Sequence, residues 1–435
     1  MKGAVPLKEK DMKPYGNKES IEAAYGLAKE AYGKLGVNTD TAIRAAGNIP
    51  ISVHCWQGDD VVGFEGASEL SGGGILTTGN YPGRARNGDE LRQDAEFAFS
   101  HIPGKKRFNL HSFYAETEGK KVARDELEPE HFKKWMDWSR ERDIPLDFNP
   151  SFFAHAMADS GYTLSSADPK IRRFWIRHGV ASRRIASAFG ANQLSPAVND
   201  IWVPDGSKDL PADRLSPRLR LRDALDEILA ISLDPKTITD AVESKLFGIG
   251  SESYVAGSHD FYLGYAAAKQ IRVCLDMGHF HPTENIADKI SSVLLFIPGL
   301  LIHFSRGVRW DSDHVAIYSD ELREVCREII RQKKTGQIDI ALDFFDASIN
   351  RIAAWVIGSR SVRKALLEAL LEPTKLLVDA ENSGRNHERL ALMEAIKTLP
   401  FSAVWDKLCL DAGVPVGIDW LGPVNDYEQS VLLKR

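Results

Sequence analysis

The sequence has few cysteines, no long hydrophobic run and no excess of basic residues. Its 435 residues include four cysteines, and none of them forms a Cys-x-x-Cys pair. This excludes a disulfide framework and is typical of a reducing compartment. The longest apolar run, residues 293–302, contains a proline and a glycine and is shorter than the roughly 18–20 residues that a membrane span needs.

The net charge of the chain argues against a nucleic-acid-binding protein. The chain has 55 Lys and Arg against 61 Asp and Glu, a formal net charge of −6, and so lacks the electrostatic footprint of a nucleic-acid-binding protein. The first residues also lack the apolar core of a secretory signal. We therefore expect a cytoplasmic protein that binds neither a membrane nor nucleic acid.

Short apolar segments alternate with helical stretches along the chain. The segments are residues 49–57, 107–116, 144–153, 197–206, 239–248, 271–280, 300–313 and 337–348. Strands that alternate with helices indicate a parallel sheet, and eight such units predict a closed (β/α)8 barrel, which is an α/β fold. The alternative is an open doubly wound sheet, which should carry a glycine-rich phosphate-binding turn. The candidate for such a turn, SGGGILTTGN, fits neither known pattern.

The pattern divides the chain into three parts. Residues 1–18 are polar and are interpreted as a flexible tail. Residues 19–360 would form the barrel domain, which begins with an amphipathic helix that Ser20 is expected to cap. Residues 361–435 are helical in pattern and punctuated by prolines, and they predict a C-terminal helical extension that packs on the barrel or on a neighbouring subunit.

Acidic and histidine side chains gather at the ends of the last four apolar segments. In a (β/α)8 barrel the carboxyl ends of the strands surround the active site. The residues expected there are Glu243, Lys245, Asp276, His279, His303, Asp311, Asp313 and Asp343. Taken singly, each could be a turn cap or a surface group, and the WDSD stretch could form an Asx turn.

As a group, the five carboxylates and two histidines indicate a metal centre. Clustered carboxylates repel one another in a low-dielectric site, and divalent cations relieve that repulsion. Oxygen and imidazole ligands without a thiolate favour manganese, magnesium, cobalt or zinc over an iron–sulfur or structural zinc site, and of these four ions we expect manganese first. Seven ligands exceed the need of one ion with open positions, so we expect two metals that share a bridging carboxylate.

Aromatic and polar side chains of the earlier segments could line a sugar site. Trp56 shares a strand face with His54, His111 shares one with Asn109, and Trp202 lies within the fourth segment. Each of these side chains could contact a sugar or simply pack in the core, and the sequence leaves both interpretations open.

Long motifs in the sequence resemble those of the L-rhamnose isomerase family, from about residue 20 to the C-terminus. The strings that carry the resemblance are SVHCWQGDDV, TGNYPGRARN, LDFNPSFFAH, IWVPDG, AVESKLFGIG, CLDMGHFHPTE, VRWDSDHV and ALDFFDASINRIAAWVIG. The family is similar in fold to xylose isomerase. The resemblance implies a (β/α)8 barrel and an intramolecular oxidoreductase that interconverts L-rhamnose and L-rhamnulose with two divalent metals.

Carried over motif by motif, the resemblance assigns two metal sites. The structural metal falls on Glu243, Asp276, His303 and Asp343, and the catalytic metal on His279, Asp311 and Asp313, with Asp276 as the bridge. Substrate contacts fall on Lys245, His111, Trp56 and Trp202. The family also implies a homotetramer, and residues 1–18 extend beyond its usual start.

The reaction moves one hydrogen between C1 and C2 of the open sugar. A hydride could shift directly, or a base could pass a proton through an enediol, and both routes stay open. Lys245 could donate a hydrogen bond to O1, Asp343 or a water on its metal could move the hydroxyl proton, and His111 could assist ring opening. The competing classes are another metal-dependent barrel enzyme, such as a hydrolase or zinc endonuclease, and a sugar-binding protein without catalysis.

Overall fold

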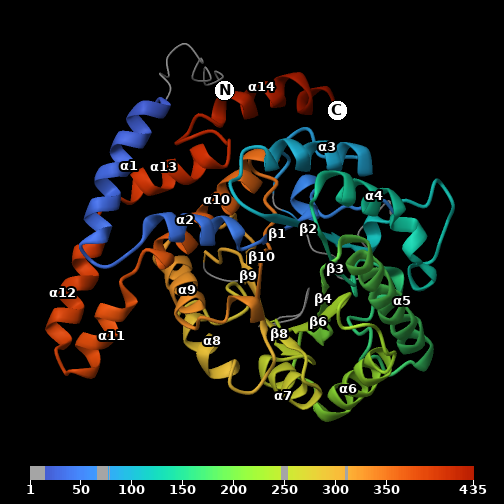
Figure 1. Ribbon diagram of the computed structural model, residues 1–435. Coiled ribbons are helices and arrows are strands. Elements are labelled where there is room, and N and C mark those ends of the chain that lie inside the picture. Colours follow the sequence, from blue (N-terminus) through green and yellow to red (C-terminus); the bar gives the residue numbers. More distant parts are fainter. Residues whose placement is uncertain (1–14, 66–76, 78, 246–252, 309–311) are drawn as a thin grey trace.

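Eight parallel strands close into a barrel that is surrounded by helices (Figure 1). The computed structural model describes residues 15–65, 77, 79–245, 253–308 and 312–435. The spatial order of the strands is β1-β10-β9-β8-β6-β4-β3-β2, so the first strand pairs with the last. The barrel strands are β1 (Ile51–His54), β2 (Lys106–His111), β3 (Leu146–Asn149), β4 (Ala197–Trp202), β6 (Ile238–Glu243), β8 (Arg272–Asp276), β9 (Leu300–Phe304) and β10 (Ile338–Leu342).

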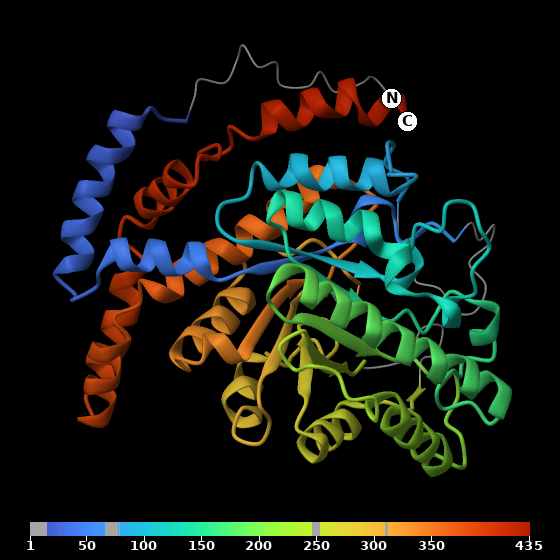
Figure 2. The same ribbon diagram turned by 45° about the vertical axis from the view of Figure 1, so that its right-hand side comes forward.

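Each barrel strand overlaps one of the eight apolar segments, and the predicted (β/α)8 fold is confirmed. A ring of helices covers the barrel from outside, as both ribbon views show (Figures 1 and 2). They are α3 (Gly88–Phe99), α4 (Lys133–Arg142), α5 (Pro169–Gln193), α6 (Leu215–Leu229), α7 (His259–Lys269), α8 (Ala287–Val293), α9 (Asp320–Arg331) and α10 (Arg351–Leu370). A small antiparallel pair, β5 (Gly206–Ser207) and β7 (Tyr254–Val255), lies outside the barrel sheet.

The cap of the N-terminal helix lies three residues earlier than predicted. Helix α1 (Lys18–Gly33) has Asn17 as its N-cap, and the Asn17 side chain accepts a hydrogen bond from the Ser20 backbone N–H at 2.9 Å. The Ser20 hydroxyl in turn accepts from the Asn17 N–H at 3.2 Å. The prediction that Ser20 is the cap is therefore wrong: Ser20 is the third helical residue of a capping box, a role that its side chain fills equally well.

Further helices at both ends of the chain form a second hydrophobic core beside the barrel. Buried side chains of α1, α2 (Thr39–Asn48), α10 and α13 (Phe401–Asp411) pack together there. Helix α10 runs across residue 360, where we placed the domain boundary, and has buried residues on both sides of it. The division of the chain into three parts stays a prediction.

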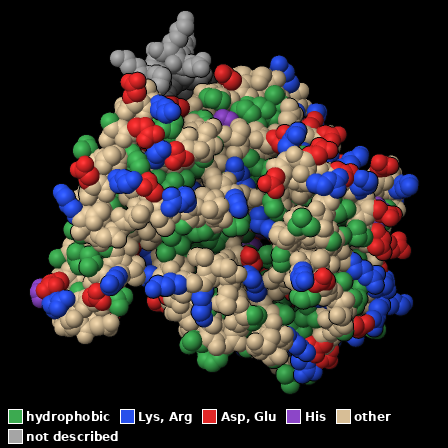
Figure 3. Space-filling model, viewed as in Figure 1, with side chains coloured by type: hydrophobic (Ala, Val, Ile, Leu, Met, Phe, Trp, Pro, Cys, Tyr) green, Lys and Arg blue, Asp and Glu red, His purple; other side chains and the backbone are tan. Residues whose placement is uncertain are grey.

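Helices α11 (Thr374–Asn382) and α12 (Asn386–Ile396) project from the body as an arm (Figures 1 and 2). Helix α12 contains no buried residue. Hydrophobic side chains lie among charged ones on this arm (Figure 3), and Leu390, for example, is 56% exposed. The last helix, α14 (Leu421–Ser430), returns along the barrel towards α3 (Figure 1).

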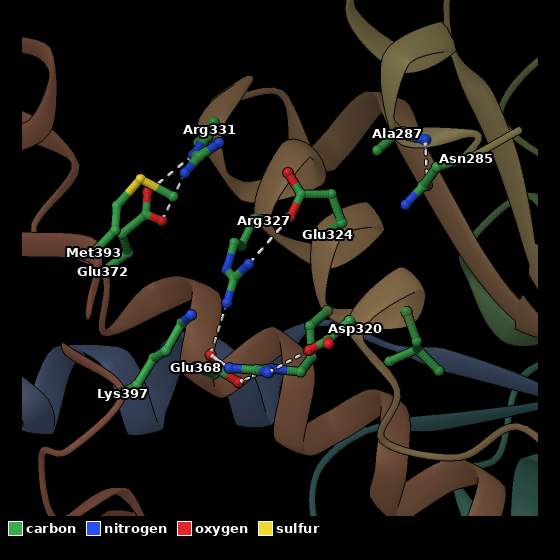
Figure 4. Close-up of polar contacts among 12 residues, drawn as sticks. Asn285, Ala287, Asp320, Glu324, Arg327, Arg331, Glu368, Glu372, Met393 and Lys397 are labelled. Atoms are coloured by element: carbon green, nitrogen blue, oxygen red, sulfur yellow. Dashed lines mark hydrogen bonds and ion pairs between the residues drawn. The ribbon is translucent and has the colours of Figure 1, made fainter. Parts of the chain in front are cut away.

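A ladder of ion pairs joins α9 to α10 beneath this arm (Figure 4). Arg323 and Arg327 of α9 both contact the Glu368 carboxylate, at 2.5 and 3.0 Å. One turn further, Arg331 pairs with Glu372 at 2.7 Å. Glu368 lies in the last turn of α10 and Glu372 lies two residues beyond its end, so the ladder connects α9 to the C-terminal end of the helix that follows the last strand.

The barrel interior is apolar on one side and polar on the other. Small apolar side chains from β4 to β10 pack together: Val198, Ala241, Cys274, Leu301 and Ala341. The strands β1 to β4 instead contribute buried Ser52, Asn109, Asp147, Asn149 and Asp200. No helix formed by the described residues is long and apolar enough to cross a membrane.

Candidate metal centre and sugar site

Four of the predicted ligands meet at the carboxyl ends of neighbouring strands. Glu243 ends β6 and Asp276 ends β8, while the strand register places Asp276 beside His303 of β9. Asp343 follows β10 directly, and its backbone N–H donates to the Phe304 carbonyl at 3.1 Å. The parallel sheet therefore brings together residues that are 100 positions apart in the chain.

His303 lies at the centre of this group. Its Nδ1 atom is 3.1 Å from Asp343 Oδ2, 3.2 Å from Glu243 Oε1 and 3.7 Å from Asp276 Oδ2. One ligand atom from each of the four residues lies within 4.8 Å of the others, and all four side chains are buried. Three carboxylates around one imidazole make a compact pocket of oxygen and nitrogen donors.

The three carboxylates of this group carry more negative charge than its one imidazole can balance. Burial raises the pKa of Asp276 to about 7 and also raises the pKa of Asp343. Burial opposes the ionisation of Glu243 too, but the rings of His303 and His279 hold its pKa well below the usual value. The protein alone thus carries the full negative charge of the group only at a high cost in free energy.

A divalent cation fits this donor set. Asp276 Oδ2 and Asp343 Oδ1 are buried and make no hydrogen bond to any described residue. Unpartnered acceptors of this kind are costly unless a cation or an ordered water satisfies them. Oxygen ligands with one imidazole suit manganese, magnesium, cobalt or zinc.

The second predicted metal group is described in part. His279 Nδ1 lies 3.2 Å from Glu243 Oε1 and 2.7 Å from the Ser244 carbonyl oxygen, so this ring adjoins the first group. Asp313 is half-buried and has a left-handed backbone with φ of 46°, a conformation that is uncommon outside glycine and concentrated at functional sites. Asp311 lies outside the described residues.

An aromatic wall lines the other side of the barrel mouth. The ring of Trp56, in the turn after β1, stacks on His111 with centroids 4.1 Å apart. Trp202 ends β4, and the Lys245 Nζ atom lies 4.9 Å from its ring centroid. Trp56 Nε1, Trp202 Nε1 and His111 Nδ1 are buried and make no hydrogen bond to any described residue. A ligand rich in hydroxyl groups would supply their missing partners.

Burial lowers the pKa of His111 to about 3, so its ring is neutral at physiological pH. The ring can therefore donate and accept a hydrogen bond, as expected of a group that contacts sugar hydroxyls.

Two further polar residues, Asp200 and Asn149, were not predicted from the sequence and are buried in the barrel interior. Asp200 precedes Trp202 by two residues on β4. The alternation of side chains along a strand therefore could have indicated that it points to the same face.

A closed parallel barrel with buried carboxylates and an imidazole at the carboxyl ends of its strands defines a (β/α)8-barrel protein with a candidate metal centre. The family model for L-rhamnose isomerase (RhaA) matches residues 19–435. The chain belongs to the L-rhamnose isomerase family, a family of isomerases, and the resemblance inferred from the motifs is confirmed.

Individual relatives agree with the family. The chain is 56% identical over 416 residues to the L-rhamnose isomerase of Rhodopirellula baltica, which covers 96% of this chain and 97% of the relative. It is also 54% identical to the L-rhamnose isomerase of Yersinia pseudotuberculosis, and the match covers 96% of this chain and 99% of that relative. The solved structure of a D-allulose 3-epimerase from Methylomonas sp. matches 75% of this chain and 98% of the epimerase chain, at 12% identity and a TM-score of 0.46. A likeness of this degree carries no argument about activity.

Proposed function

We propose that this chain interconverts L-rhamnose and L-rhamnulose, as a step of L-rhamnose catabolism, at a metal centre built on four neighbouring strands. The observation that supports this most strongly is the buried group of Glu243, Asp276, His303 and Asp343 in a chain that matches the family over nearly its full length. These four residues would hold one ion. His279, Asp311 and Asp313 would hold a second, with Asp276 as the bridge and manganese as the preferred metal.

When bound, the two ions would act as Lewis acids on the sugar oxygens. The side chains of the protein would bind the sugar and move its protons. Lys245, whose ammonium group lies over the Trp202 ring, would donate a hydrogen bond to O1. Asp343 would move the hydroxyl proton, and neutral His111 would assist ring opening. Trp56 and Trp202 would form the apolar wall against which the methyl group of the sugar packs.

The decisive experiment measures ketose formation and metal content on one preparation. A panel of aldoses is incubated with the purified chain and added Mn²⁺, and a metal-free sample serves as the control. Ketose should form fastest from L-rhamnose and only in the presence of metal. Hydrolysis of a sugar or nucleic acid instead, or sugar binding without ketose, would assign the chain to one of the competing classes.

Deuterium at C2 of the aldose should be retained at C1 of the ketose. The side chains that would surround the reacting carbons are buried, with Trp56, His111 and Trp202 each at most 5% exposed, so a hydrogen that shifts as a hydride never meets water. NMR of the ketose after many turnovers measures the label. Loss of label that grows with each turnover would favour the enediol route and a base such as Asp343.

We also propose that the chain forms a homotetramer in the cytoplasm. The projecting arm supports assembly, because its exposed apolar side chains, such as Leu376, Val378 and Leu390, gain nothing within one chain. The described cysteines are all free thiols buried from solvent, which agrees with a reducing compartment.

Leu390→Asp should break or weaken this assembly, because it places a charge among the exposed apolar side chains of the arm. The matched control is Leu194→Asp at the end of α5, since Leu194 is 96% exposed and lies away from the arm. Sedimentation velocity measures the mass of both variants. The arm has no part in assembly if both sediment like the unsubstituted chain.

A further inference from the structure

Six polar side chains form a closed ring inside the barrel, and all are at most 8% exposed: His54, Asn109, Asn149, Asp200, His303 and Asp343. They come from β1, β2, β3, β4 and β9 and from the position after β10. Two of its members, His303 and Asp343, belong to the candidate metal centre. The other four have no assigned role.

Short contacts connect the ring on the polar side of the barrel. The Asn109 amide nitrogen lies 2.6 Å from His54 Nε2 and donates to Asn149 Oδ1 at 2.6 Å. The Asn149 amide nitrogen donates to Asp200 Oδ2 at 3.2 Å. His54 Nδ1 completes the ring at 3.3 Å from Asp343 Oδ1. The position of Asp200 is thus fixed by a chain of side-chain amides.

The two nitrogens of His303 face two different groups. Nδ1 faces Glu243, Asp276 and Asp343, as described above. Nε2 lies 3.9 Å from Asp200 Oδ2 and makes no hydrogen bond to any described residue. An imidazole that binds a metal through one nitrogen carries a hydrogen on the other, and a carboxylate that accepts this hydrogen fixes the tautomer and the ring orientation.

The other carboxylates of the barrel floor have different partners. Asp147 pairs with Arg107 at 2.7 Å, and Asp339 pairs with Arg272. The contacts of Asp200 run instead to Asn149, His303 and Glu243. A cavity of about 180 Å³ below the centre is lined by Asp200 and His303, among other residues.

We propose that Asp200 is a positioning residue of the metal centre. In the metal-loaded centre its carboxylate would accept the Nε2 hydrogen of His303 and so hold Nδ1 towards the three carboxylates of the candidate centre. The inference rests on the proposed function, because it requires that the centre binds a metal.

Titration of the metal-free protein with Mn²⁺ alone tests the proposal, with isothermal calorimetry as the readout. Asp200→Ala should weaken one of the two metal equivalents by roughly 10–100-fold and leave the other unchanged. Asp200→Asn should bind within a few-fold of the unsubstituted chain, because an amide oxygen in the Oδ2 position still accepts from both Asn149 and His303. If Asp200→Ala does not fold, Asp200→Ser replaces it, because a serine hydroxyl is too short to reach His303.

Asp205→Asn is the matched control. Asp205 is equally buried, but it accepts four hydrogen bonds from Thr163 and Ser165 instead of facing the centre. Its substitution should change stability and leave the affinity for Mn²⁺ unchanged.

Two results would overturn the proposal while the metal centre stands. One is Mn²⁺ binding by Asp200→Ala as tight as that of the unsubstituted chain. The other is binding by Asp200→Asn as weak as that of Asp200→Ala, which would make Asp200 a direct ligand, together with Glu243, Cys274 and His303. An unsubstituted chain that binds no Mn²⁺ would overturn the metal centre itself and this inference with it.

Discussion

Asp276→Asn should lower kcat by on the order of 10³-fold, a loss of about 4 kcal/mol of transition-state stabilisation. Asp276 Oδ1 already accepts hydrogen bonds from the Gly278 N–H at 2.5 Å and the Ser305 hydroxyl at 2.7 Å. The amide oxygen of the asparagine would take that position, because only an oxygen can accept both bonds. The amide nitrogen, which cannot bind a metal, would then occupy the Oδ2 position beside His303. Steady-state kinetics at saturating Mn²⁺ measures the effect.

The control for this variant is Asp240→Asn, on the same sheet. Asp240 lies three residues before Glu243 on β6, but it pairs with Arg183 of helix α5 at 2.9 Å. This substitution should lower the free energy of unfolding and leave kcat per folded molecule close to that of the unsubstituted chain. Near-normal turnover by Asp276→Asn would remove Asp276 from the proposed ligand set.

Removal of metal should abolish activity and lower Tm. The four proposed ligands come from β6, β8, β9 and the end of β10, so one ion would join half of the barrel. A ligand that binds only the folded chain adds about 2.7 kcal/mol to the free energy of unfolding when its free concentration is about 100 times Kd. Differential scanning calorimetry before and after treatment with a chelator measures the change.

Return of Mn²⁺ should restore both Tm and activity, and the same treatment should shift the Tm of Asp276→Asn by less. A Tm that does not change after verified removal of metal would show that the ion does not stabilise the barrel.

The sequence predicted the barrel well because its strands are short apolar runs that end in polar residues. The paired segments 271–280 and 300–313, for example, contain β8 and β9, and the proposed ligands Asp276 and His303 lie side by side. Local detail was harder to predict. Asn17 and Ser20 are both good cap residues, and only the backbone conformation decides between them.

The buried polar side chains of the barrel interior could not be predicted from the sequence. A barrel core is normally filled by apolar side chains, so Asn149 and Asp200 within a strand suggest a solvent-facing position when they are taken singly. Their burial is possible because they satisfy one another in three dimensions, across strands β3 and β4. Alternation along β4 can assign Asp200 to a face of the strand, but it does not show which side chain of a neighbouring strand satisfies it.

The pairing of the first strand with the last has a consequence for how the protein is made. Ser52 and Val53 of β1 pair with Ala341 and Leu342 of β10, so the sheet cannot close until most of the chain has left the ribosome. Until then β1 and β9 have open edges, which are prone to pair with other chains. Asp343 follows the closing strand directly, so its carboxylate can join the other three proposed ligands only after closure. Metal loading would therefore be a late event in the life of each newly made chain.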